Sequence, residues 1–161
     1  MNQRGGDIKV TAINGTTLQT SAVALSGVGF SGYDVAVNPR TNKVYVSGGE
    51  LLAIIDGKTL ASQTLAIAAA SGLIAVNAAT DRVYFRSKQS SGSLDSVTVM
   101  DGSTLNTTVV STGQNAAAIL VDEKQNQVYA VNADSGIVTV IDGASNVTTT
   151  LPAGYGPGAL P

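Results

Sequence analysis

The sequence contains no cysteine, no histidine and no tryptophan. The absence of cysteine excludes a disulfide framework. Without histidine or cysteine the chain cannot form a Ser-His-Asp triad, a cysteine nucleophile or the usual zinc site. Axial ligation of haem through histidine is excluded for the same reason. We therefore expect no catalytic residues, no metal site and no cofactor bound by this chain.

Charge is also scarce, because only 12% of the residues are charged and the formal net charge is -2. A soluble domain usually carries about twice that charged share. No stripe or cluster of cations would match a row of phosphates, so duplex nucleic acid is a poor partner. Single strands are disfavoured too, since they need a basic groove with stacking aromatics. The basic residues are scattered along the chain: Arg4, Lys9, Arg40, Lys43, Lys58, Arg82, Arg86, Lys88 and Lys124.

Long apolar runs are missing as well. The longest, Leu65 to Val76, is interrupted by Ser71 and Gly72, whereas a bilayer span needs roughly 20 apolar residues. We interpret it as the end of one strand, a turn and the start of the next. The first ten residues, MNQRGGDIKV, contain no apolar core of a signal peptide. The sequence predicts no membrane span and shows no signal peptide.

What the chain does contain is an internal repeat. One block is an apolar triplet followed by Asn or Asp, a polar stretch and Val-Tyr. Its tyrosines, Tyr45, Tyr84 and Tyr129, are 39 and 45 residues apart. The three copies read VAVNPRTNKVYV (35–46), IAVNAATDRVYF (74–85) and ILVDEKQNQVYA (119–130).

A second block gives the same period independently. It is a β-rich run that ends in Asp-Gly or Asn-Gly, and its turn residues are 42, 45 and 41 residues apart. The four copies read VTAINGTTL (10–18), LAIIDGKTL (52–60), VTVMDGSTL (97–105) and VTVIDGASN (138–146). Two independent markers therefore indicate one repeat of a little over forty residues.

Each unit reads as four strands, which we call A to D. Strand A is the apolar triplet, B the Val-Tyr segment, C the run before Asp-Gly and D the Thr-rich run after it. Asp-Gly predicts a C–D hairpin because both residues tolerate positive φ. Asn42, Asp81 and Asn126 precede strand B, where the turn needs the same tolerance. Four strands in about forty residues predict an all-β fold, a β-propeller of four-stranded antiparallel blades.

The repeat resembles the YVTN family of bacterial β-propeller repeats, which runs approximately apolar-AVNP-x-TNKVYV-TN, a short loop, then VSVIDG-x-TN. Residues 35–48, VAVNPRTNKVYVSG, are close to the first part, and residues 128–146, VYAVNADSGIVTVIDGASN, to the second. The resemblance covers about residues 7 to 158. It implies a propeller that is extracytoplasmic, meaning periplasmic, secreted or at the cell surface, and it implies no particular ligand. Trp-Asp repeats are the main rival, and the lack of Trp and His argues against them.

About three and a half blades fit in the chain. We expect a half-blade at 7–25, full blades at 32–67, 72–110 and 117–151, and a lead-in to a further blade at 152–161. Such an array leaves sheet edges open, which closed propellers avoid. One hypothesis is a fragment of a longer, seven-bladed protein. The alternatives are closure by self-association with a second copy, or an open array.

Most polar residues in phase with the repeat have a structural interpretation. Asp56, Asp101 and Asp142 are predicted hairpin residues, although a ring of them would suit cations. The pair Asp122-Glu123 is predicted to be a solvated A–B turn. The glycine-rich stretch 26–32, SGVGFSG, is predicted to be a turn between blades. The repeated tyrosines are predicted to pack between blades.

Residues outside the repeat are the better functional candidates. The B–C and D–A loops of a propeller share one face, and residues 88–95, KQSSGSLD, form an insertion in one B–C loop. Phe30, Asn115 and Tyr155 are further possible contacts. The ligand-binding candidates are Arg86, Lys88, Gln114, Asn132 and Asp134.

The leading hypothesis is a non-catalytic binding or scaffolding module that holds a protein or small ligand on this loop face. The alternative is part of a dehydrogenase-like or lyase-like propeller enzyme whose catalytic groups lie outside this chain. Catalytic groups or a cofactor site in flanking sequence would discriminate the two.

Overall fold

The computed structural model describes residues 8–25, 34–67, 70–88, 95–113, 116–132 and 135–153. Within these ranges the regular secondary structure is entirely β-strand. No helix long and apolar enough to cross a bilayer occurs there. The all-β prediction is therefore confirmed.

The strands form one two-stranded and three four-stranded sheets, all antiparallel and all in sequence order. The half-blade contains β1 (Ile8–Ile13) and β2 (Thr20–Leu25). The first blade contains β3 (Asp34–Asn38), β4 (Lys43–Gly48), β5 (Leu51–Asp56) and β6 (Ser62–Ala66). The second contains β7 (Ala70–Asn77), β8 (Arg82–Lys88), β9 (Asp95–Asp101) and β10 (Thr107–Ser111). The third contains β11 (Ala116–Asp122), β12 (Gln127–Asn132), β13 (Ile137–Asp142) and β14 (Thr148–Pro152).

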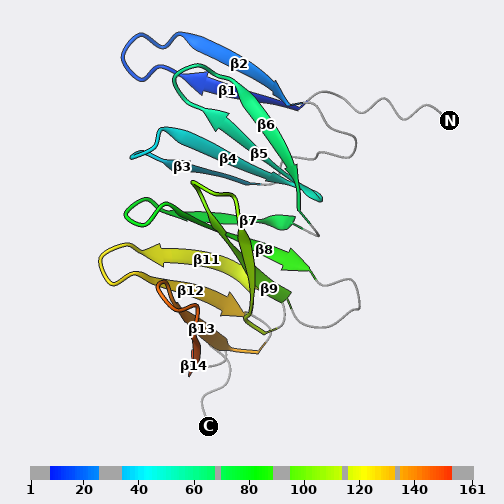
Figure 1. Cartoon of the computed structure of the whole chain (residues 1–161), viewed down its shortest axis with the longest axis vertical. Coiled ribbons are helices and arrows are strands. Elements are labelled where there is room, and N and C mark those ends of the chain that lie inside the picture. The colour runs from blue at the N-terminus through cyan, green and yellow to red at the C-terminus, as the bar shows by residue number, and fades with distance from the viewer. Residues whose placement is uncertain are drawn as a thin grey trace, which may run out of the picture.

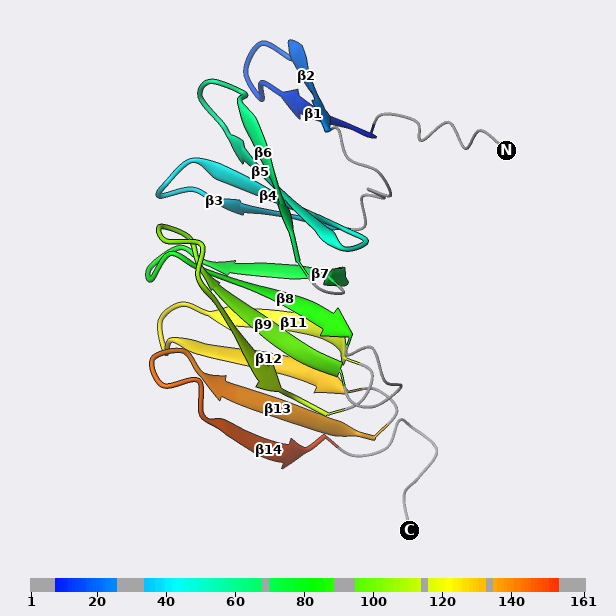
Figure 2. The same ribbon diagram turned by 45° about the vertical axis from the view of Figure 1, so that its right-hand side comes forward.

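The sheets follow one another in space in the order of the chain, from the half-blade at the top of Figure 1 to the third blade at the bottom. The innermost strands of consecutive blades touch, β3 against β7 and β7 against β11. The A–B and C–D turns all point to the same side, the left of Figures 1 and 2. We call this side the turn face, and the opposite side, where B–C and D–A connections run, the loop face.

Apolar side chains between consecutive blades form the core. Tyr45 and Tyr84 are fully buried at these contacts, as the repeat predicts, while Tyr129 in the third blade is only half-buried. Burial of each large apolar side chain contributes about 1.5–3 kcal/mol, so the blades depend on their neighbours. The first contact contains Tyr45, Leu52, Ile54, Ile74, Val83, Phe85 and Met100. The second contains Tyr84, Val97, Val99, Val110, Ile119, Val128, Ala130 and Ile141.

The turns differ from the sequence prediction in one respect. The A–B turns do place positive φ at the predicted residues, with φ of 53°, 52° and 51° at Asn42, Asp81 and Asn126. In the C–D turns, however, positive φ does not fall on the Asp-Gly pair. It falls near the end of the turn, on Leu18, Leu60, Leu105 and Asn146. The hairpins were predicted correctly, but the conformational reason for their glycines was wrong.

The glycines of the C–D turns are required by a close approach instead. Gly57 donates its backbone N–H to the Asn42 carbonyl at 2.7 Å. A Cβ at Gly57 would lie 2.9 Å from that carbonyl oxygen and 2.6 Å from Asn42 Oδ1. The same approach recurs at Gly102 over Asp81 and at Gly143 over Asn126. Each C–D turn therefore packs directly on the A–B turn of its own blade.

Tyr45 provides a stability prediction, because its buried hydroxyl has no hydrogen-bond partner. Burial raises the pKa of Tyr45 to about 12. We expect Tyr45→Phe to leave the free energy of unfolding at pH 7 unchanged or raise it by up to ~1 kcal/mol, since it removes an unsatisfied polar group. Thermal or urea unfolding would measure this.

The same substitution has a pH signature. The pKa of Tyr45 is about 12 in the folded protein, whereas tyrosine in the unfolded chain has a pKa of about 10. The neutral Tyr45 therefore contributes its full stabilisation below pH ~10, and this contribution is lost as the pH rises towards 12. Tyr45→Phe should therefore lessen the loss of stability between pH 10 and 12. Tyr129→Phe is the control, because Tyr129 donates to Gln127 Oε1 at 2.8 Å and should lose about 0.5–1 kcal/mol. A larger loss from Tyr45→Phe would mean that the Tyr45 hydroxyl is satisfied.

Candidate functional site

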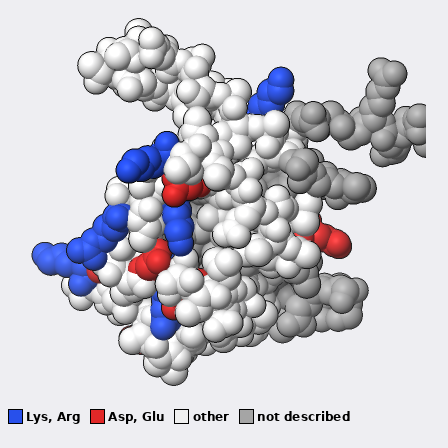
Figure 3. Space-filling model, turned by 45° about the horizontal axis from the view of Figure 1, so that its top comes forward, with Lys and Arg blue, Asp and Glu red and all other residues white. Residues whose placement is uncertain are grey.

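The turn face carries most of the charge visible in Figure 3, where blue and red atoms gather along the left side. Three of its acidic residues, Asp56, Asp101 and Asp142, accept hydrogen bonds from the backbone of their own turns. Oδ1 of Asp56 accepts the N–H groups of Lys58 and Thr59 at 2.9 and 2.7 Å. Asn14, Asp101 and Asp142 accept the corresponding pairs in their own turns.

These bonds also set the electrostatics of the turn face. The hydroxyl of Ser103, with the N–H groups of Thr104 and Ser103, holds the pKa of Asp101 well below its usual range. The backbone of Thr59 lowers the pKa of Asp56, and the backbone of Ser145 lowers that of Asp142. No group of three or more acidic side chains suited to a metal occurs among the described residues. The geometry therefore gives these three carboxylates a structural role.

The A–B turns link one blade to the next through a repeated amide contact. Asn38 is fully buried and donates Nδ2–H to Asp81 Oδ1 of the second blade at 2.7 Å. Asn77, equally buried, donates to Asn126 Oδ1 of the third blade at 2.9 Å. The Oδ1 atom of each Asn simultaneously caps its own turn. One side chain thus fixes a turn and joins two blades.

Basic side chains add a parallel link. Lys43 Nζ donates to the Gly102 carbonyl at 2.6 Å, and Arg82 donates to the Gly143 carbonyl at 2.6 Å. Glu123 of the third blade makes a link in the opposite direction along the chain, because its carboxylate accepts the N–H of Ala78 in the second blade at 2.8 Å. The predicted solvated A–B turn at Asp122-Glu123 is present, with Asp122 capping it and Glu123 exposed, and Glu123 in addition contacts the second blade. Lys43, Arg82 and Glu123 therefore join neighbouring blades at the turn face.

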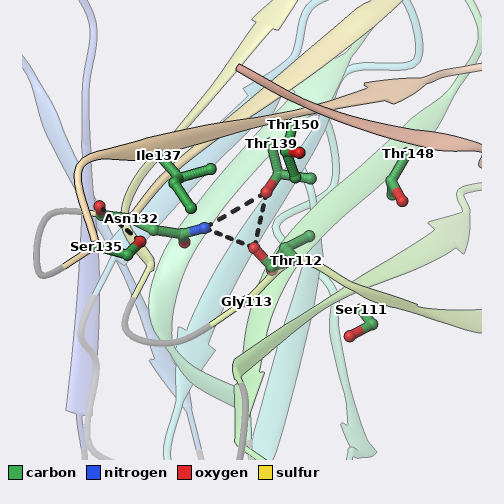
Figure 4. Close-up of a pocket in the computed structure, with 9 residues that line it drawn as sticks. All are labelled: Ser111, Thr112, Gly113, Asn132, Ser135, Ile137, Thr139, Thr148 and Thr150. Carbon is green, nitrogen blue, oxygen red and sulfur yellow. Dashed lines mark hydrogen bonds between the residues drawn. The ribbon is translucent and has the colours of Figure 1, made fainter. Parts of the chain in front are cut away.

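The loop face contains a pocket of about 350 Å³ between the second and third blades. Of the described residues that line it, six carry a hydroxyl group and none is charged at neutral pH. β10 and the segment after it form one side, and β12, β13 and β14 form the other (Figure 4). The lining residues are Ser111, Thr112, Gly113, Asn132, Ser135, Ile137, Thr139, Thr148 and Thr150.

A buried polar network forms the floor of this pocket. Asn132 Nδ2 donates to the Thr112 carbonyl at 2.6 Å and contacts Thr139 Oγ1 at 3.4 Å. Thr139 Oγ1 donates to the same carbonyl at 2.8 Å. Asn132 is 2% exposed, yet its Oδ1 has no hydrogen-bond partner. A buried acceptor without a partner is unusual and marks this end of the pocket.

Gly113 completes the floor because it has no side chain. Its φ is +92°, and a Cβ there would lie 3.0 Å from Asn132 Nδ2. Any larger residue would strain the backbone and press on the amide that the network holds. Gly113 therefore fixes the approach of the D–A connection to Asn132.

The structure places one of the five predicted ligand-binding residues in this pocket, Asn132. Arg86 lies on β8, is partly buried and does not line the pocket. Lys88 ends β8, but its side chain is outside the described residues, as are Gln114 and Asp134. The insertion, the glycine-rich stretch 26–32, Phe30, Asn115 and Tyr155 also fall largely or wholly outside them. Contact by any of these residues stays a prediction.

Sequence reasoning missed the hydroxyl residues of the pocket. Thr139 is in phase with Thr98 of the second blade, and Thr148 and Thr150 belong to a D strand that is Thr-rich like the others. Because these threonines recur in the repeat, the sequence indicates a structural role for them. The available signal was Asn132, since Ser87 and Gly48 occupy its position in the other blades.

Comparison with solved structures identifies the architecture. The chain matches a chain of the mitotic checkpoint complex with a TM-score of 0.72 and 18% identity, over 91% of this chain and 44% of that one. It also matches the β-propeller domain of the Trilobed protease from Pyrococcus furiosus, with a TM-score of 0.58 and 11% identity, over 80% of this chain and 45% of that one. The fold is a β-propeller. About three and a half blades of it lie in this chain.

A third match is a protein from Bacteroides fragilis described as a candidate 6-phosphogluconolactonase, with a TM-score of 0.63 and 14% identity, over 89% of this chain and 47% of that one. At these identities the likeness shows the propeller fold alone. The chain spans less than half the length of each of these three structures. No family model matches the sequence. No curated protein matches it either.

Proposed function

We propose that this chain is a non-catalytic binding or scaffolding module, a segment of a larger propeller that holds its ligand or partner on the loop face. The rigid blades would present the pocket between the second and third blades at that face. The YVTN resemblance adds the proposal that the protein works outside the cytoplasm, and self-association to complete the propeller is the alternative to a longer chain.

The observation that carries the proposal is the chemistry of the pocket. Where the structure describes the lining, its side chains are hydroxyls, one amide and the aliphatic Ile137, and none of them is charged. Such groups bind a ligand through hydrogen bonds and apolar contact. They supply neither a general acid-base pair tuned near neutral pH nor an activated nucleophile. Binding without turnover is the function that this geometry supports best.

An assay with 6-phosphogluconolactone tests the proposal against the enzyme alternative, because one similar fold bears a lactonase description. Hydrolysis would be followed by acid release with and without the protein. We expect the rate with wild-type protein to equal the buffer rate. Catalysed hydrolysis that Thr139→Val or Thr150→Val abolishes would replace the binding function with an enzymatic one.

A further inference from the structure

We propose that the pocket between the second and third blades binds a neutral polyhydroxyl ligand, a sugar unit of a saccharide. This inference rests on the proposed binding function and names the ligand class. The volume of the pocket, about 350 Å³, lies at the lower end of the range of small-molecule sites.

The uncharged side chains that the structure describes around the pocket favour a neutral ligand. An anion or cation that left water for this pocket would find hydroxyls and an amide, but no opposite charge, among the described lining residues. Removing an unpaired ion from water is strongly unfavourable. A ligand with many hydroxyls exchanges its bonds with water for equivalent bonds with Ser and Thr side chains.

The distribution of the hydroxyls favours a ligand with donors and acceptors on several sides. Ser111 lies on one wall and Thr148 on the facing wall, with Thr150 beside Thr139 (Figure 4). Ser111, Thr148 and Thr150 are exposed, whereas Thr112 and Thr139 are buried at the floor. Ile137 offers an aliphatic surface to the C–H groups of a sugar ring.

A peptide fits this site less well. Peptides that add to a sheet need free backbone donors and acceptors. In the pocket wall β13 is paired on both sides, with Thr139 between Ala130 of β12 and Thr150 of β14. Among the described residues, β10 and β14 are the outer strands of their sheets and each keeps one unpaired edge, so a peptide is the occupant that the test must separate. The hydroxyl-rich side chains around the pocket favour a saccharide.

The test is an array that carries neutral glycans built from glucose, galactose, mannose and N-acetylglucosamine, together with acidic glycans and peptides. Wild-type protein should bind neutral glycans. The dissociation constant of the best neutral glycan is then measured by calorimetry. Thr148→Val combined with Thr150→Val should weaken it at least tenfold, since it removes two hydroxyls of the pocket.

Thr149→Val is the matched control, because Thr149 lies between these two residues on β14 and does not line the pocket. Successive side chains of a strand point to opposite faces, so this change should alter the dissociation constant less than twofold. Binding should also shift the Asn132 side-chain amide signals in the ¹⁵N–¹H spectrum. Circular dichroism confirms that each variant is folded.

The outcomes separate the two proposals. Binding of peptides alone, weakened by the Thr148/Thr150 variant and not by Thr149→Val, overturns the saccharide class and keeps the binding function. Binding of acidic glycans in preference to neutral ones overturns it equally. Failure to bind anything on the array, or binding that the Thr148/Thr150 variant leaves unchanged, overturns the pocket as the binding site and the proposed function with it.

Discussion

Asn38→Asp is expected to lower the free energy of unfolding at pH 7 by about 3 kcal/mol, because it places two carboxylates against each other in a partly buried contact. Asn38 is fully buried and donates Nδ2–H to Asp81 Oδ1 at 2.7 Å. Aspartate keeps the Oδ1 that caps the A–B turn but loses the donor. Urea unfolding measures the loss, which should shrink on acidification because one shared proton removes the repulsion.

Asn77→Asp is the matched control for this prediction. Asn77 makes the same contact one blade later, but its acceptor is Asn126 Oδ1. The Asn126 amide can rotate and donate Nδ2–H to the new carboxylate, so we expect a loss of about 1 kcal/mol or less. Equal losses of unfolding free energy from Asn38→Asp and Asn77→Asp would contradict the prediction, because the identity of the acceptor in the next blade would then make no difference.

Gly102→Ala is expected to lower the free energy of unfolding by about 2 kcal/mol through overpacking of two turns. The new Cβ would lie 2.9 Å from the Asp81 carbonyl oxygen and also against the Asp81 carboxylate. The backbone cannot retreat freely, because Gly102 N–H donates to that carbonyl at 2.7 Å. The Gly102 carbonyl in turn accepts from Lys43 of the first blade at 2.6 Å. Thermal unfolding would measure the loss.

Gly15→Ala distinguishes this contact from a general need for glycine in the turn. Gly15 follows Asn14 as Gly102 follows Asp101, but the half-blade has no A–B turn among the described residues, and nothing lies within 4 Å of a Cβ placed at Gly15. We expect a change within ~0.5 kcal/mol, with a small gain from reduced chain entropy. Equal losses at Gly15 and Gly102 would contradict the overpacking account.

The repeat made the fold predictable from sequence. Tyr45, Tyr84 and the Asp-Gly turns mark the same strands in each unit, so each copy supports the interpretation of the others. The burial of Tyr45 and Tyr84 followed from the same argument, because a residue repeated in phase packs against the neighbouring blade.

Contacts between residues distant in sequence could not be predicted in the same way. The glycines of the C–D turns were assigned positive φ from local preference, whereas a close approach of another turn fixes them. Asn38 and Asp81 are 43 residues apart, and nothing in either block shows that one donates to the other. Local propensity describes a turn, but only the folded chain shows what lies against it.

The candidate site was predictable only in part. Asn132 departs from the residues at its position in the other blades, and the structure places it at the floor of the loop-face pocket. Thr148 and Thr150 follow the pattern of their strand, so their place in the pocket wall becomes visible only when β14 is seen beside β10. A binding site made of residue types that recur in every blade cannot be distinguished from the structural repeat in the sequence.

The central claim is that the turn face holds the blades together while the loop face binds. Hydrogen exchange of the backbone amides, with and without the neutral glycan that binds most tightly, tests it most directly. The account predicts slower exchange on binding at 111–113 and 135–139, with no change at the turns 56–61, 101–106 and 142–147. Protection of those turns with an unchanged pocket would contradict it.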